Sequence, residues 1–271
     1  MSKWKVVWMA LMLIILSVGF FLVFEDKNEA PRKLSEELPT PTVAEKSTKI
    51  AIMADIHNDS EELKMMLNKA KSNEVEIVIV AGDLTNEGKN SELIKIKKVL
   101  DAANLRYAVV PGNHEYDLDL FKNVFGKNYQ SIKIGEVKLI LIDNSYWRGL
   151  DELQKSWIQS EVVECRVWIC LAIMHKPLNN IFSTHVMGEN NKKAAEEGVW
   201  LRELLISSGV KQIEAGHLHY ASSYELEGIR TDIVGAISRD RNTQTPRYTE
   251  LVISKSLIER NVVEETDDIG N

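Results

Sequence analysis

The feature that most constrains this chain is a series of short apolar runs, most of which end at a polar motif. Six runs follow one another in residues 50–54, 76–81, 107–110, 137–142, 167–174 and 212–215. Dense Ile, Val and Leu runs of this length are typical of strands buried on both faces. Amphipathic patterns between them predict helices at residues 60–71, 91–104, 152–163 and 192–207. This alternation predicts an α/β domain.

The end of the chain has a different pattern. Residues 224–263 read as further strands and contain no clear long helix. Added to the alternating part, they predict two packed mixed sheets flanked by helices, in one domain over residues 48–271. A core of that size needs no disulfide for its stability.

The N-terminus carries an uncharged stretch. Val6 to Phe24 is 19 residues long and follows Lys3 and Lys5. A helix of that length covers roughly the 30 Å hydrocarbon layer, so residues 1–24 are predicted to be an uncleaved signal anchor and transmembrane helix. The alternative is a signal peptide cleaved near residues 17–19, which would give a secreted protein. In either case we expect the folded domain outside the cytoplasm.

Two further features complete the organisation of the chain. Residues 25–47 contain three prolines and no apolar periodicity, which predicts a flexible linker. Cys165 and Cys170 lie five positions apart. In a continuous strand they would lie about 16 Å apart, beyond the 7 Å limit for a disulfide, so free thiols are predicted.

Ligand-type residues follow five of the apolar runs. The motifs read Asp-Ile-His, Gly-Asp, Gly-Asn-His-Glu, a single His and Gly-His-Leu-His, with the candidate metal ligands Asp55, His57, Asp83, Asn113, His175, His217 and His219. Polar groups at the carboxyl ends of neighbouring strands converge on one edge of a sheet. Carboxylate, amide and imidazole ligands without thiolate suit Mn, Fe, Co, Ni or Zn. Seven ligands exceed one tetrahedral site, which predicts two divalent metal ions.

These motifs, in this order, resemble those of the calcineurin-like metallophosphoesterases. The resemblance covers about residues 49–220 and implies a four-layer αββα sandwich. It implies that one metal is held by Asp55, His57, Asp83 and His219, and the other by Asp83, Asn113, His175 and His217. Asp83 would bridge the two metals. His114 would be the catalytic general acid, and Asn113 and His114 would contact the substrate.

The implied activity is metal-dependent hydrolysis of a phosphate ester, with a bridging hydroxide as the nucleophile. Asn86 and Glu87 occupy positions where protein Ser/Thr phosphatases have Asp and Arg. The phosphate-binding Arg is therefore missing, which argues against a phosphoprotein phosphatase. Residues 82–88 (GDLTNEG) and the Gly-His-Leu-His motif resemble those of bacterial phosphodiesterases, which favours a phosphodiester substrate and leaves a phosphomonoesterase as an alternative. Two further alternatives are a pyrophosphatase acting on a nucleotide- or lipid-linked substrate and a non-catalytic scaffold. The complete ligand set argues against the scaffold.

Charge and the remaining polar residues limit the other functions. A net charge of −7 argues against a broad nucleic-acid-binding surface. No obligate protein partner is indicated. His185 fits no ligand position and is expected either on the surface or on a substrate loop. Arg239 and Arg241 could reach a phosphate from the late strands, but they suit a solvated loop better.

Overall fold

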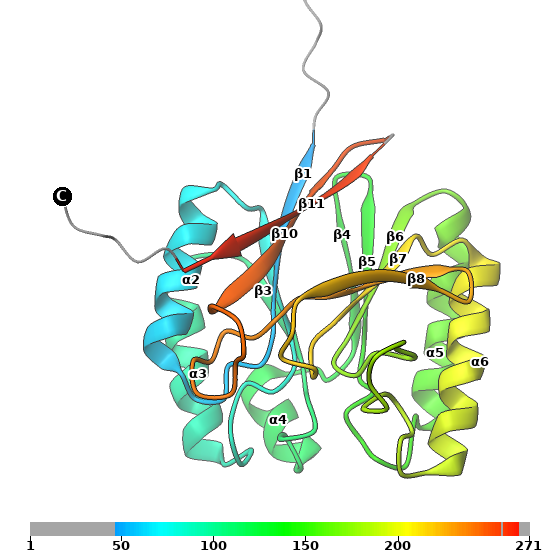
Figure 1. Cartoon of the computed structure of the whole chain (residues 1–271), viewed down its shortest axis with the longest axis horizontal. Helices are drawn as coiled ribbons and strands as arrows, with labels where there is room; N and C mark the ends of the chain where they lie inside the picture. Colours follow the sequence, from blue (N-terminus) through cyan, green and yellow to red (C-terminus); the bar gives the residue numbers. More distant parts are fainter. Residues whose placement is uncertain (1–46, 256, 266–271) are drawn as a thin grey trace, which may run out of the picture. The chain divides into compact units, whose positions relative to one another are not determined.

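Two mixed sheets form the centre of the domain in the computed structural model, which describes residues 47–255 and 257–265 (Figure 1). The first sheet has the order β11-β10-β1-β2-β3. Its strands are β1 (Thr48–Met53), β2 (Ile77–Ala81), β3 (Tyr107–Val110), β10 (Arg247–Ile253) and β11 (Ile258–Glu264). β1, β2 and β3 are parallel, whereas β10 pairs antiparallel with β1, so that Ile52 lies between Ile79 of β2 and Thr249 of β10.

The second sheet has the order β4-β5-β6-β7-β9-β8. Its strands are β4 (Gln130–Ile134), β5 (Val137–Ile142), β6 (Ile169–Met174), β7 (Gln212–Ala215), β8 (Ser222–Leu226) and β9 (Ile229–Ile233). β5, β6, β7 and β9 are parallel, and the two edge strands β4 and β8 run antiparallel to their neighbours. The parallel strands of both sheets thus end at turns that can carry a site.

Alternating side chains build three apolar layers from these sheets. On β1, Ile50 and Ile52 belong to the core between the sheets, while Ala51 and Met53 face helices. The helices α2 (Ser60–Ser72), α3 (Asn90–Ala102) and α4 (Leu118–Phe125) cover the first sheet. The helices α5 (Glu152–Val162) and α6 (Lys192–Ser208) cover the second. The predicted sandwich of two mixed sheets between helices is therefore confirmed.

Two elements of the structure, the helix α4 and the edge strand β4, were not predicted from the sequence. The predicted anchor at residues 1–24 and nearly all of the predicted linker at residues 25–47 lie outside the described residues. None of the helices that the structure describes has both the length and the apolar character needed to cross a bilayer.

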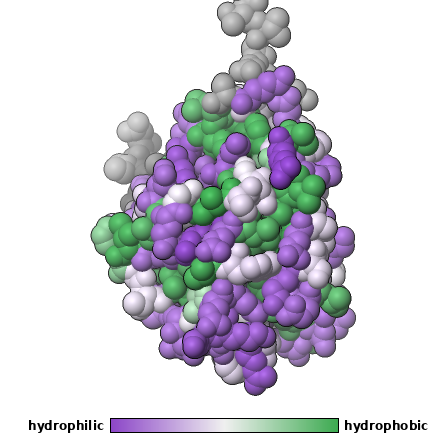
Figure 2. All heavy atoms as spheres, turned by 90° about the vertical axis from the view of Figure 1, so that its right-hand side faces the viewer, coloured by the Kyte–Doolittle hydropathy of each residue, from purple (hydrophilic) through white to green (hydrophobic). Residues whose placement is uncertain are grey.

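The outer face that carries α5 and α6 has a mixed surface. Figure 2 shows hydrophilic and hydrophobic residues side by side there, with hydrophilic ones prevailing toward its lower end. The exposed apolar residues of this region include Leu153 of α5, Val199 of α6 and Val163, which lies in the turn that follows α5. Single exposed apolar side chains of this kind are ordinary for a soluble surface.

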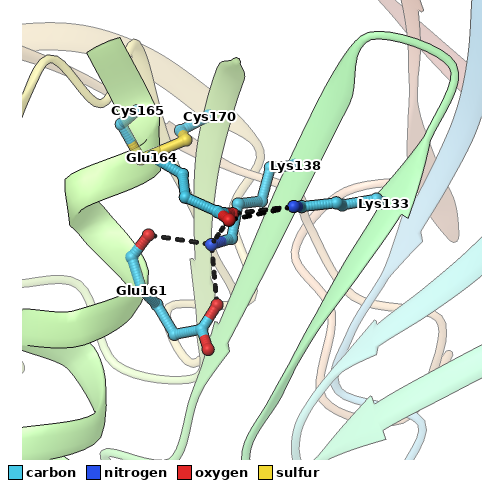
Figure 3. Close-up of a disulfide and its surroundings, with 6 residues drawn as sticks. All are labelled: Lys133, Lys138, Glu161, Glu164, Cys165 and Cys170. Carbon is cyan, nitrogen blue, oxygen red and sulfur yellow. Dashed lines mark hydrogen bonds and ion pairs between the residues drawn. A yellow bond between two sulfur atoms is a disulfide. The ribbon is translucent and has the colours of Figure 1, made fainter. Parts of the chain in front are cut away.

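The prediction of free thiols is wrong, because Cys165 and Cys170 form a disulfide (Figure 3). Residues Val163–Arg166 form the 3-10 helix η1 instead of continuing β6. This turn brings the two Cα atoms to 5.3 Å, within disulfide range. Beside the disulfide, the buried ammonium of Lys138 pairs with Glu161 at 2.7 Å and with Glu164 at 2.6 Å.

We expect the disulfide to stabilise the domain modestly. A Cys165→Ser, Cys170→Ser double variant should lose about 2 kcal/mol of unfolding free energy, because the closed loop is short. For a domain of this size that is a drop of about 4–8 °C in Tm. Thermal unfolding with and without a reductant measures it. The reductant should lower the Tm of the wild type toward that of the variant and leave the variant unchanged; an unchanged wild type would contradict a stabilising bond.

Candidate metal centre

The predicted ligands lie at the carboxyl ends of five parallel strands. Asp55 and His57 follow β1, Asp83 follows β2, and Asn113 follows β3. On the second sheet, His175 directly follows β6, and His217 and His219 follow β7. The two sheets thus contribute ligands from facing sets of turns.

The structure brings these residues together in two groups. Ligand atoms within 4.8 Å of one another come from Asp55, His57, Asp83 and His219 in the first group, and from Asp83, His175 and His217 in the second. The amide oxygen of Asn113 lies 3.1 Å from Nε2 of His175, which places Asn113 at the second group. All seven predicted ligands therefore meet at one centre.

Asp83 belongs to both groups, and its two oxygens have different surroundings. Oδ1 accepts a hydrogen bond from the backbone N–H of His114 at 3.0 Å. Oδ2 lies 3.3 Å from Nε2 of His175 and 3.8 Å from Nε2 of His57. Oδ2 is thus located between the imidazoles of the two groups.

The backbone is strained where the ligands lie. Nine non-glycine residues among those described have a positive φ, and five of them are ligands: Asp55, His57, Asp83, His217 and His219. Side chains make this conformation costly, and such residues concentrate at functional sites. The surrounding hydrogen bonds hold the turns in place. For example, the backbone N–H groups of Ile56 and His57 both donate to the carbonyl of Asp83.

Glycines allow the ligand turns to approach each other closely. A Cβ on Gly112 would lie 2.1 Å from Oδ1 of Asp83, and one on Gly82 would lie 2.5 Å from Nδ1 of His175. Gly82 also has a φ of +88°, which favours glycine. Close packing in the site therefore requires a glycine before Asp83 and before Asn113, which explains the Gly-Asp and Gly-Asn pairs of the sequence.

Two ligand imidazoles are oriented by backbone carbonyls. The Nδ1–H of His175 donates to the carbonyl of Ala81 at 2.9 Å, and that of His219 donates to the carbonyl of Arg241 at 2.8 Å. This arrangement leaves each Nε2 directed to the centre, as in many metal sites.

Closely spaced imidazole nitrogens show that the residues suit metal ions. Nδ1 of His217 lies 3.2 Å from Nε2 of His175. Nε2 of His57 and Nε2 of His219 approach within 3.1 Å. Imidazole nitrogens packed this closely around carboxylates form a set of ligands that suits divalent cations.

The protonation states of the residues at the centre also suit a metal ion. Burial lowers the pKa of His57 to about 3, so its imidazole is neutral and can act as a ligand. Burial opposes ionisation of Asp83, yet the neighbouring His175 holds the pKa of this carboxyl below its ordinary value. Burial likewise opposes protonation of His175, but Asp83 raises the pKa of this imidazole to about 9. A cation that binds here therefore displaces a proton.

Comparison with protein families agrees with this geometry. The family model of calcineurin-like phosphoesterases matches residues 48–221, which include every ligand of the centre. The chain belongs to this family. The C-terminal strands beyond the match complete the first sheet of the phosphoesterase through β10 and β11.

Two related proteins are named as probable phosphodiesterases. The phosphoesterase is 26% identical over 175 residues to a probable cyclic nucleotide phosphodiesterase of Rhodococcus erythropolis, covering 59% of this chain and 56% of the relative. It is 25% identical over 183 residues to a probable glycerophosphodiester phosphodiesterase of Arcobacter nitrofigilis, covering 62% of this chain and 65% of the relative. The chain thus spans less than two thirds of the length of either relative.

Solved structures share the fold at low identity. Purple acid phosphatase PPD1 of yellow lupin superposes with a TM-score of 0.61 at 14% identity, covering 82% of this chain and 52% of the lupin enzyme. GAP50, the anchor in the inner membrane complex of Plasmodium, superposes with a TM-score of 0.62 at 10% identity, covering 82% and 85%. At these identities the likeness concerns the fold alone.

Sequence reasoning overlooked two residues that position the phosphoesterase's ligands. The buried carboxylate of Glu115 accepts hydrogen bonds from the Gly112 N–H at 2.8 Å and from the hydroxyl of Thr85 at 2.8 Å, which joins two ligand turns. Burial, together with nearby Asp83, raises its pKa to about 7. Asn144, at the end of β5, accepts from the backbone N–H of His175 at 3.1 Å. Glu115 could have been noticed as the last residue of Gly-Asn-His-Glu; no motif signals Asn144.

His114 is oriented by a main-chain partner. Its Nδ1–H donates to the backbone carbonyl of Asn86 at 2.6 Å, in place of the Asp side chain that the sequence lacks. Its Nε2 lies 3.9 Å from Oδ2 of Asp83 and 3.4 Å from the guanidinium of Arg241. His114 therefore lies at the edge of the centre, with its orienting partner on the main chain.

Arg239 and His185 lie on loops, as the sequence predicted. Arg239 is on an exposed loop and forms ion pairs with Glu62 at 2.7 Å and with Glu265. His185 is exposed, and its ring centroid is 6.5 Å from that of the ligand His217. His185 thus lies on a loop that borders the metal centre.

Proposed function

We propose that this phosphoesterase hydrolyses phosphodiesters with two divalent metal ions bound at the centre. The observation that carries the proposal is the sharing of Asp83 between two ligand groups. The first ion would be held by Asp55, His57, Asp83 and His219, and the second by Asp83, Asn113, His175 and His217. When bound, such a pair of ions lowers the pKa of water, neutralises phosphate charge and aligns an in-line displacement.

We assign His114 the transfer of a proton to the leaving group. The carbonyl of Asn86 holds Nδ1, so Nε2 is directed toward the centre. The side chain is 18% exposed and can reach a bound ester, and it belongs to neither ligand group. A protonated Nε2 at that place can neutralise the alkoxide as its bond to phosphorus breaks.

Arg241 supports the binding of the phosphate. Its guanidinium is 3.4 Å from Nε2 of His114, and its carbonyl accepts from the ligand His219. Among the described residues, Arg239 is paired with two carboxylates, whereas no ion pair involves Arg241. A guanidinium beside the centre and free of carboxylates can bind a phosphate oxygen, which compensates for the Arg missing at position 87.

Replacement of Arg241 should weaken the phosphate interaction. We expect Arg241→Ala to lower kcat/KM by about 10- to 100-fold, the cost of one charge-assisted contact. Arg241→Lys should recover part of the loss, because it keeps a charge without the bidentate geometry. Steady-state kinetics on bis(p-nitrophenyl) phosphate measure both. Arg239→Lys is the matched control and should change kcat/KM less than threefold; equal effects at the two positions would refute the assignment.

Two observations favour diesters over monoesters. Only one guanidinium, that of Arg241, borders the centre in the described part of the chain, and a diester carries one negative charge where a monoester carries up to two. Both relatives described above are named as phosphodiesterases. The same centre could also act on a pyrophosphate linkage, and a substrate panel distinguishes these activities.

The deciding experiment uses the full-length chain, purified in detergent and freed of metal with a chelator. Addition of Mn²⁺ should restore hydrolysis of bis(p-nitrophenyl) phosphate, and elemental analysis should give about two ions per chain. The rate on p-nitrophenyl phosphate should be lower. Absence of turnover with Mn²⁺, Fe²⁺, Co²⁺, Ni²⁺ and Zn²⁺ would refute the activity, and faster monoester hydrolysis would refute the preference.

We also propose that the domain works outside the cytoplasm, tethered by the apolar segment at residues 6–24. The Cys165–Cys170 disulfide supports this location, because disulfides persist in oxidising compartments. Protease treatment of intact cells tests it through cleavage in the linker at residues 25–47. Protection of the linker, together with two alkylatable thiols in freshly lysed cells, would contradict the location.

A further inference from the structure

We infer that the hollow beside His217 binds a planar aromatic ring carried by one ester group of the substrate. The hollow has a volume of about 620 Å³, within the range of small-molecule sites. Its walls come from the loop after β6, with Phe182 and His185, and from the turn after β7, with His217, Leu218 and Tyr220. The inference rests on the proposed function, because the ring would be attached to a phosphate at the metal centre.

The position of the hollow connects it to the reaction. His217 is one of the candidate ligands, and it also lines the hollow. A group bonded to a phosphate at the centre can therefore enter the hollow without a long linker. The ring of His185 meets that of His217 edge to face, at an interplanar angle of 73°. This pair extends the aromatic lining up to the ligand itself.

The side chains of the hollow are suited to a ring. Phe182 is 87% exposed and Tyr220 is 55% exposed, so both aromatic rings are available to an incoming group. Stacking of a planar ring on such side chains is favourable and tolerates many ring types. His185 is already paired with Glu189 at 2.7 Å, and none of the eight lining residues, all of them described, is Lys or Arg. The lining thus favours an uncharged occupant over an anionic one.

Both walls are held in place by polar contacts. The hydroxyl of Tyr224 on β8 donates to the carbonyl of Asn179 at 2.5 Å, and the amide of Asn179 donates to Glu227 at 2.9 Å. Farther along the loop, the backbone N–H of Met187 donates to the carbonyl of Pro177 at 2.9 Å. In the other wall, the backbone N–H of His217 donates to the carboxylate of Asp55 at 2.9 Å, so both walls are fixed to the rest of the fold.

His217 also lines a second hollow, which has a different character. It measures about 370 Å³ and is lined by Lys176 and Glu189 as well as Tyr146 and Trp147. Charged groups at this side suit a polar ester group. The two hollows together indicate a diester with unlike substituents, in which the aromatic one lies against Phe182 and Tyr220.

Binding of three phosphonates separates this inference from the proposed activity. Phenylphosphonate, cyclohexylphosphonate and methylphosphonate share the metal-binding group and differ in the substituent. Isothermal titration of the full-length, Mn²⁺-loaded chain in detergent gives their Kd values. Phenylphosphonate should bind about tenfold or more tighter than methylphosphonate. It should bind a few-fold tighter than cyclohexylphosphonate, which is apolar but not planar.

Variants locate the ring. In the Phe182→Ala, Tyr220→Ala double variant the preference for phenylphosphonate should fall to less than threefold, with the Kd of methylphosphonate unchanged. Trp147→Ala, in the second hollow, is the matched control and should keep the full preference. Equal binding of phenyl and cyclohexyl compounds, or a preference that survives the double variant, would overturn the inference. Failure of all three compounds to bind would instead refute the phosphate site itself.

Discussion

Asp83→Asn is expected to lower kcat/KM by more than about 1,000-fold and to abolish binding of the second metal ion. The substitution keeps the shape of the side chain and removes its charge. Because Oδ2 lies between the imidazoles of both ligand groups, loss of this charge weakens both sites at once. Elemental analysis of the dialysed variant, with kinetics on bis(p-nitrophenyl) phosphate at saturating Mn²⁺, measures the two effects.

A matched substitution controls for folding. Asp59→Asn makes the same change four residues after Asp55, at the N-cap of α2, where the carboxylate accepts the N–H of Glu62. Asn caps helices as well as Asp does, so metal content and activity should stay within threefold of the wild type. Retention of two ions and of activity by Asp83→Asn would contradict the shared-ligand assignment. A circular dichroism spectrum of Asp83→Asn equal to that of the wild type would exclude unfolding as the cause of the loss.

The sequence predicted which residues gather at the centre, because each of them lies shortly after a buried strand. The runs at residues 107–110, 137–142 and 212–215 coincide with β3, β5 and β7. Parallel strands place their carboxyl ends together, so residues adjacent to those ends meet wherever the strand order allows. His175 shows the strength of this argument, because the strand before it brings a single His without a motif next to Asp83 and His217.

The elements that were missed lack such a pattern. The edge strand β4, with the sequence Gln-Ser-Ile-Lys-Ile, alternates polar and apolar residues and is only five residues long. The helix α4 has eight residues, of which only Phe121 is buried. The disulfide was missed because residues 165–170 were read as one continuous strand, whereas residues 163–166 form a turn of 3-10 helix. Short-range geometry, not composition, decides such cases.

Contacts made by main-chain atoms could not be predicted from the sequence either. The partner of His114 is a backbone carbonyl, and any residue at position 86 would supply one. Arg241 is 22 positions after His219, on a loop whose path is set by the packing of β10 against β1. Such contacts carry no residue signature, which explains why the sequence favoured a solvated loop for Arg241.

His114→Ala is expected to slow hydrolysis of an alkyl diester by about 100- to 10,000-fold, the usual contribution of a general acid. Metal content should stay at the wild-type level, because His114 is in neither ligand group. The loss should be much smaller with bis(p-nitrophenyl) phosphate, since p-nitrophenolate leaves without a proton. The ratio of the two losses therefore reports proton transfer itself. Kinetics on both diesters at equal Mn²⁺ give this ratio.

Asn86→Ala provides the matched control, because it removes the side chain and keeps the carbonyl that orients Nδ1 of His114. The side-chain amide of Asn86 donates to the carbonyl of His57, so a small and uniform loss on both diesters is expected. Equal losses on both diesters in His114→Ala would mean that His114 only binds the phosphate. Loss of a metal ion in that variant would make it a ligand. A loss confined to the poor leaving group is the result that identifies His114 as the acid, because no ligand or binding role depends on the basicity of the departing oxygen.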